Sequence, residues 1–141
     1  MIRRALALGL VVGLVNCASL SVRDAAGQSI VTAETARHLA VDIELSQRCG
    51  QPTSLPGHCI SPEQHAHFVA ILVQAETYLK DARDIYNLLP TTGSPDISAI
   101  TQIIAKVAVI IQEVMNGLPT PEAQAKLGAS PAVVKTLAVG K

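Results

Sequence analysis

The chain has 141 residues in which 11 Lys and Arg balance 11 Asp and Glu, and 49% of its residues are hydrophobic but only 2% are aromatic. The basic residues are scattered, and aromatic side chains that would stack on bases or sugars are scarce. This excludes a nucleic-acid-binding protein and argues against a sugar-binding groove. A chain of this length fits one domain with a modest core.

Residues 1–16 have the pattern of an export signal. Arg3 and Arg4 precede an apolar run over residues 5–15, and Cys17 follows shortly after it. The run has the length of the apolar region of a signal peptide and is too short to span ~30 Å of hydrocarbon. Removal of this signal leaves 9 basic and 11 acidic residues, a formal charge of −2.

Leu14, Val15 and Cys17 resemble the lipobox of bacterial membrane lipoproteins, and Asn16 stands where Gly, Ala or Ser is usual. The resemblance implies that Cys17 is the lipidation site, because the lipobox cysteine becomes the acylated first residue of the mature protein. It also implies the outer membrane, facing the periplasm, as the location. Ala18 follows the cysteine in place of the Asp that is associated with inner-membrane retention.

Two other outcomes of export stay open. Ordinary signal-peptidase cleavage after Ser19 or Ala26 would release a soluble periplasmic protein. If it were not cleaved, the uncharged segment 5–22 would remain as a membrane anchor.

Residues 17–29 are predicted to form a tether, because the segment from Ser19 to Ser29 is small, polar and aperiodic. A helical bundle domain follows over residues 30–141. Its first helix is predicted from about Thr32 to Arg48, with an apolar stripe made of Ala36, Leu39, Ala40 and Ile43.

Cys49 and Cys59 are the pair of cysteines that remains after either route of signal processing. In an oxidising compartment we expect them to form a disulfide that staples the first helix to the start of the second. A metal site with His58, His65 and His67 is a weaker alternative, and free thiols are a third. His65 and His67 are two apart on a predicted helix and therefore point to different sides, so we predict no metal and no other cofactor.

Four Ser-Pro or Thr-Pro pairs predict helix starts. A hydroxyl at the N-cap and a proline at the first helical position both favour initiation, as does an acidic residue in the first turn. The caps are Ser61, Ser94, Thr120 and Ser130, and Gln64 completes a capping box at the first.

Two long amphipathic helices are predicted after Ser61 and after Ser94, folded back as an antiparallel hairpin. A narrow seam would suit a two-stranded coiled coil, whereas a flank of further apolar residues widens the first stripe and favours a bundle. The first stripe is Phe68, Leu72, Ala75, Leu79, Ala82, Tyr86 and Leu89 with the flank Ile71, Tyr78 and Ile85, and the second is Ile97, Ile100, Ile104, Val107, Ile111, Val114 and Leu118.

The segment 97–118 is apolar enough to be weighed as a membrane span. Lys106 and Glu113 would be costly at mid-bilayer and are ordinary at the exposed edge of a buried helix, so we expect the latter. Short helices over 121–127 and 131–138 are predicted to end the chain. The expected fold is an all-α small helical bundle of about three main helices, built on an antiparallel helical hairpin.

No pattern of residues indicates catalysis, and we predict no catalytic residue and no enzyme. Glu76, Lys80 and Asp84 are spaced as i, i+4 ion pairs on a charged face of the second long helix. His65 and His67 are expected on the first turns of the same helix, with a pH-sensing or ligand role as the minor alternative.

The function predicted from these observations is that of a small exported, lipid-anchored helical protein of the cell envelope with a structural or protein-interaction role. Its partners would be the membrane, through the lipid anchor, and a protein or a second copy. The alternative is a phage- or prophage-encoded lysis or superinfection-exclusion lipoprotein. A less favoured alternative is a carrier of a small apolar ligand, which needs a cavity in the bundle core.

Overall fold

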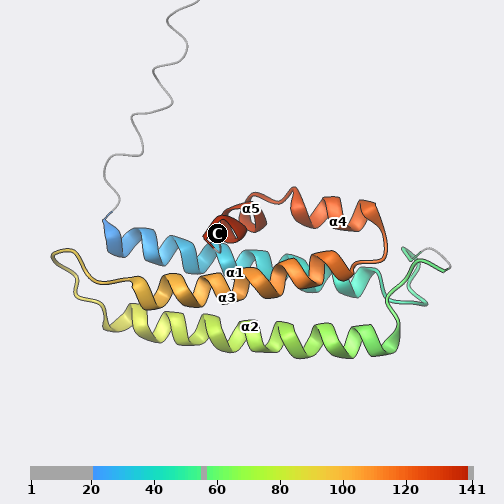
Figure 1. The fold of residues 1–141 in the computed structure, drawn as a ribbon, viewed down its shortest axis with the longest axis horizontal. Coiled ribbons are helices and arrows are strands. Elements are labelled where there is room, and N and C mark those ends of the chain that lie inside the picture. The colour runs from blue at the N-terminus through green and yellow to red at the C-terminus, as the bar shows by residue number, and fades with distance from the viewer. Residues whose placement is uncertain (1–20, 55–56, 140–141) are drawn as a thin grey trace, which may run out of the picture.

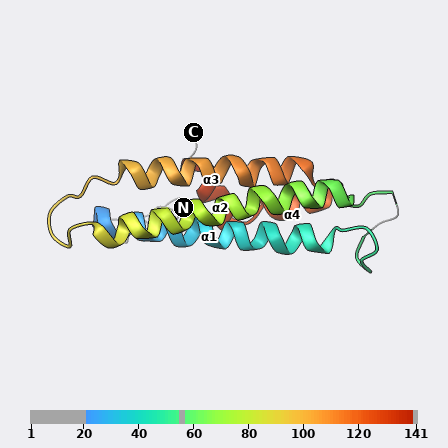
Figure 2. The ribbon, with the colours of Figure 1, turned by 90° about the horizontal axis from the view of Figure 1, so that it is seen from below.

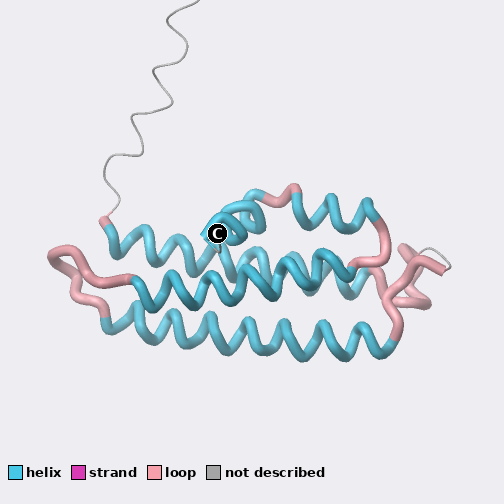
Figure 3. Tube along the Cα trace, viewed as in Figure 1, coloured by secondary structure: helices cyan, strands magenta, loops and turns pink. Residues whose placement is uncertain are grey.

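The computed structural model describes residues 21–54 and 57–139, and the described residues form five helices and no strand (Figures 1 and 3). This confirms the predicted all-α bundle. Three long helices lie side by side, and α2 runs antiparallel to the other two (Figures 1 and 2). The helices are α1 (Val22–Ser46), α2 (Pro62–Leu88), α3 (Ser98–Gly117), α4 (Pro121–Gly128) and α5 (Pro131–Val139).

α1 begins earlier than the sequence analysis predicts, at Val22 rather than near Thr32. Ser21 is its N-cap, and the Ser21 hydroxyl accepts a hydrogen bond from the backbone N–H of Asp24 at 3.1 Å. The predicted tether over residues 17–29 is therefore wrong from Val22 onward. The early turns are helical because their small apolar residues are buried, with Ala26 only 2% exposed. Residues 1–20, including the predicted signal and Cys17, lie outside the described residues.

Small residues allow α1 and α2 to approach closely. Ala33 and Ala40 on α1 and Ala75 on α2 are completely buried. Gly27 lies so near the ring of Tyr86 that a Cβ atom at position 27 would come 3.1 Å from the Tyr86 hydroxyl. The interface of α1 and α2 thus includes several short side chains, whereas the buried residues of α3 are mostly bulky aliphatic ones.

The start of α2 follows the prediction and the start of α3 does not. At Ser61 the capping box is complete, since Ser61 and Gln64 exchange side-chain to backbone hydrogen bonds. α3 begins at Ser98 rather than after Ser94. There the Asp96 carboxylate accepts a hydrogen bond from the Ser98 N–H at 2.8 Å, which lowers the pKa of Asp96. This local turn competes with helix formation at 95–97.

α3 is the central helix of the core and packs against α1, α2 and α5. By length and composition it is the one described helix that could cross a membrane, with a mean hydropathy of 1.5. The predicted stripe explains this composition, because its apolar residues are buried among the surrounding helices. The buried residues of α3 are Ile100, Ile104, Val107, Ala108, Ile110, Ile111 and Val114.

The C-terminal helices α4 and α5 lie on the side of α1 and α3 that faces away from α2 (Figure 1). Thr120 caps α4 as predicted, and its hydroxyl accepts a hydrogen bond from the Ala123 N–H at 3.2 Å. Leu127 and Val133 are completely buried. α4 and α5 therefore act together as a fourth helical segment, interrupted by a turn, that packs on the core of three long helices.

Candidate functional site

The predicted disulfide is present where α1 ends and α2 begins. The sulfur atoms of Cys49 and Cys59 are 1.96 Å apart and the Cα atoms 4.9 Å apart. The backbone beside them is also paired, since Cys49 donates to the carbonyl of Ile60 and Ile60 donates to that of Gln47. The loop between the cysteines is thus stapled at its base, as expected. Among the described residues no group of three His, Cys, Asp or Glu side chains is placed to hold a metal.

Among the described residues, Arg37 Nε donates a hydrogen bond to the Leu72 carbonyl across the seam between α1 and α2, and four contacts between side chains also cross it. Counted from the N-terminus of α1, they are Arg23 over the ring of Tyr86, Glu34 with Arg83, Arg37 with Glu76, and Glu44 with His65. We call them the seam contacts. They differ from the predicted pattern, because Glu76 pairs with Arg37 on α1 rather than with Lys80. The other predicted pair is present, and the Asp84 carboxylate 2.6 Å from Lys80 raises the pKa of that amine.

The contact between Glu44 and His65 is the most buried of the four. The Glu44 side chain is 2% exposed and that of His65 is 22% exposed, and Glu44 Oε1 lies 2.5 Å from His65 Nδ1. His67 points elsewhere, as predicted, and its Nε2 lies 2.8 Å from Glu113 Oε1 on the exposed side of α3. The sequence analysis missed Glu44, although its position four residues after Ala40 places it on the buried stripe.

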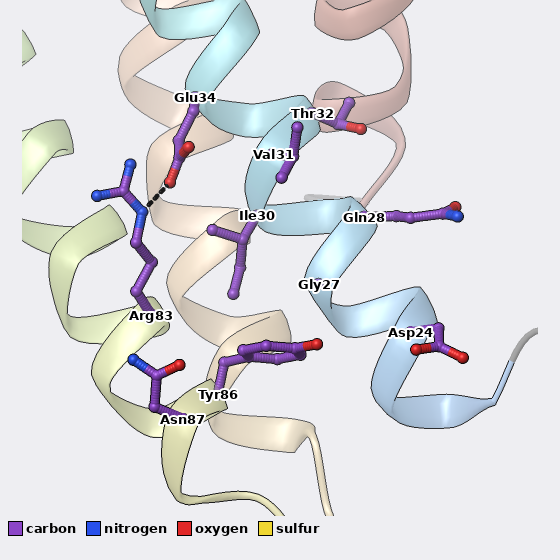
Figure 4. Close-up of a pocket in the computed structure, with 10 residues that line it drawn as sticks. All are labelled: Asp24, Gly27, Gln28, Ile30, Val31, Thr32, Glu34, Arg83, Tyr86 and Asn87. Carbon is purple, nitrogen blue, oxygen red and sulfur yellow. Dashed lines mark hydrogen bonds and ion pairs between the residues drawn. The ribbon is translucent and has the colours of Figure 1, made fainter. Parts of the chain in front are cut away.

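A hollow of about 730 Å³ opens between α1 and α2 near the start of α1 (Figure 4). Gly27 and the buried Ile30 line its α1 side, and Tyr86 lines its α2 side. The ion pair of Glu34 and Arg83 crosses one edge of it (Figure 4). We call this hollow the seam groove. It is a surface groove rather than the cavity in the bundle core that a carrier of an apolar ligand would need.

The seam groove is lined by both apolar and polar side chains. Its two carboxylates are already engaged, since Glu34 pairs with Arg83 and Asp24 accepts a hydrogen bond from the Ser21 hydroxyl at 2.7 Å. The residues that line it include no histidine or cysteine. An apolar floor with a polar rim is suited to a ligand or a partner side chain.

The most exposed of the large apolar side chains that the structure describes lies at the end of the bundle at which α1 begins and α2 ends, whereas Leu45 and Val69, toward the opposite end, are each 42% exposed. Leu88, the last residue of α2, is 85% exposed, and Val22, the first residue of α1, is 40% exposed. We call this end, with Val22, Leu88 and the loop 89–97, the proximal end; it lies at the left of Figure 1. The disulfide lies at the opposite, distal end.

Comparisons with known proteins find no match: no protein-family model, no curated protein and no solved structure matches this chain. The predicted lipidation site, Cys17, lies outside the described residues. Cys49 and Cys59 are brought together as predicted, and the seam contacts and seam groove are features that sequence analysis missed.

Proposed function

We propose that this protein is an exported cell-envelope protein, held to a membrane by an acylated Cys17, with a structural or protein-interaction role and no catalysis. The observation that carries the proposal is the bond between Cys49 and Cys59. Disulfides persist in oxidising compartments outside the cytoplasm. The disulfide thus agrees with the export signal that precedes Cys17, although the two features are independent parts of the sequence.

The start of α1 supports processing close to Cys17. Cleavage after Ala26 would remove the Ser21 cap and a core residue, because Ala26 is 2% exposed. Cleavage before Cys17 or after Ser19 would leave the whole of α1 intact. Of these two, cleavage before Cys17 is favoured by the lipobox-like residues 14–17.

An interaction role is supported by the character of the described surface. The seam groove combines an apolar floor with a polar rim, and a disulfide staples α1 to α2 at the opposite end of the bundle. A rigid body of this kind presents a surface to a partner without rearrangement. The proposed location is the outer membrane, facing the periplasm, where the lipid anchor would hold this surface near the bilayer.

Metabolic labelling with radioactive palmitate in a bacterial host tests the anchor. The full-length chain should incorporate label and sediment with membranes, Cys17→Ser should lose the label, and Ser19→Ala should keep it as the matched control. Wild-type protein that is unlabelled and soluble in the periplasm would refute the proposal.

Alkylation of the envelope protein tests the compartment. Cys49 and Cys59 should react with a thiol reagent only after reduction, and the mass difference should correspond to two thiols. Alkylation of both cysteines without reductant would contradict export to an oxidising compartment.

A further inference from the structure

We propose that the proximal end of the bundle docks onto the lipid bilayer that holds Cys17, so that α1 stands on the membrane with its N-terminus down. The proposal rests on the acylation of Cys17 proposed above. Cys17 is four residues from Ser21, the N-cap of α1. A fully extended chain covers about 14 Å over four residues, at ~3.3–3.6 Å each. An acylated Cys17 therefore keeps the start of α1 close to the lipid surface.

The side chains at the proximal end are suited to a lipid surface. Leu88 and Val22, both exposed, lie at this end, and an exposed leucine loses unfavourable contact with water when it enters the acyl region. The adjoining loop 89–97 carries a single charge, Asp96. The first turn of α1 at this end adds two opposite charges, Arg23 and Asp24. These charged groups have to stay at the level of the lipid headgroups while the apolar side chains enter the hydrocarbon.

Polar atoms at the same end are suited to lipid headgroups. The guanidinium of Arg23 lies 4.5 Å from the centre of the Tyr86 ring, and its Nε has no hydrogen-bond partner among the described residues. Arginine and tyrosine are favoured at the boundary between lipid and water, where an apolar body and a polar tip are both satisfied. Because this Nε is buried, the terminal nitrogens of Arg23 are the ones that would meet lipid phosphate while Leu88 enters the apolar layer.

This orientation fixes the height of the other features. α1 has 25 residues, which corresponds to about 37 Å at 1.5 Å per residue. The disulfide at the distal end then lies roughly that far from the bilayer, whereas the seam groove, which Gly27 and Tyr86 line, lies beside the membrane. A partner protein that binds in the seam groove would therefore bind next to the lipid surface.

The test uses the absence of tryptophan from the natural chain, because any introduced tryptophan is then the sole reporter. Leu88→Trp and Val22→Trp place it at the proximal end, and Leu45→Trp is the matched control on α1 near the distal end, where Leu45 is 42% exposed. All three positions are at least partly exposed, so the variants should fold as wild type does, which circular dichroism checks.

The full-length acylated variants are reconstituted into phosphatidylcholine and phosphatidylglycerol vesicles with and without brominated phosphatidylcholine. We expect the emission of Leu88→Trp and Val22→Trp to shift to the blue and to be quenched several-fold more strongly than that of Leu45→Trp. Acylated, vesicle-bound protein in which all three reporters are quenched equally, or in which the proximal ones are not quenched, overturns the docking alone. A preparation in which mass spectrometry finds no fatty acid on Cys17 overturns the proposed function and the docking with it.

Discussion

Replacing His65 with leucine should destabilise the fold far more than replacing its partner Glu44 with methionine. The Glu44 side chain is 2% exposed, and among the described residues His65 makes its one side-chain hydrogen bond. Without His65 a buried carboxylate loses its partner. Without the carboxylate, the imidazole that remains is 22% exposed and can be hydrated.

The expected magnitudes follow from this asymmetry. Removing the partner of a buried carboxylate lowers the free energy of unfolding by about 3–5 kcal/mol. Because water reaches His65, we expect about 3 kcal/mol for His65→Leu, a large share of the ~5–15 kcal/mol that stabilises a domain. For Glu44→Met we expect a loss below about 1 kcal/mol, since an apolar side chain of similar size fills the site. The double variant should resemble Glu44→Met.

Urea denaturation followed by circular dichroism measures these differences. The matched control is His67→Leu, because the side chains of His67 and Glu113 are 54% and 49% exposed. That exposed contact should contribute no more than about 1 kcal/mol. Equal losses of stability in His65→Leu and His67→Leu would refute the reasoning that burial of Glu44 gives His65 its importance.

Two further predictions concern the core. Ile104→Asp should unfold the domain, because it buries an unpaired carboxylate at a position that is 1% exposed. Lys106→Asp, on the exposed side of α3, should leave the helicity and the melting temperature nearly unchanged. If circular dichroism showed the reverse order of damage, α3 would face the other way. Gly117→Ala should lower the free energy of unfolding by about 1–3 kcal/mol in urea denaturation, because the new Cβ would come 2.5 Å from Cζ of the buried Phe68. Gly128→Ala, whose Cβ would meet only a flexible methionine side chain, should change it by less than about 1 kcal/mol. Equal effects of the two substitutions would contradict the packing of Phe68.

The fold could be predicted from the sequence where local chemistry and apolar spacing agree. At Ser61 a hydroxyl, a proline and Gln64 all favour the same helix start, and the structure has it. At Ser94 the same signal was outweighed by the turn that Asp96 forms with the Ser98 backbone. The sequence does not predict the start of α1, because Ala26 and Gly27 give no strong apolar period and their packing depends on contacts with residues far along the chain.

The candidate site could be predicted only in part. The disulfide could be predicted from the number of cysteines, because Cys49 and Cys59 are the two that remain when the signal is removed or Cys17 is acylated. The seam contacts could not be predicted, because they depend on the register of α1 against α2. Glu34 and Arg83, for example, are 49 positions apart, and no local pattern links them.

The measurement that tests the account most directly is the intact mass of the protein purified from bacterial membranes, with sequencing of its N-terminal peptide. The account predicts a chain that begins at Cys17, carries fatty acid on that residue and is lighter by two hydrogens than its reduced form. A chain that begins elsewhere, or that begins at Cys17 without lipid, would contradict the lipid anchor.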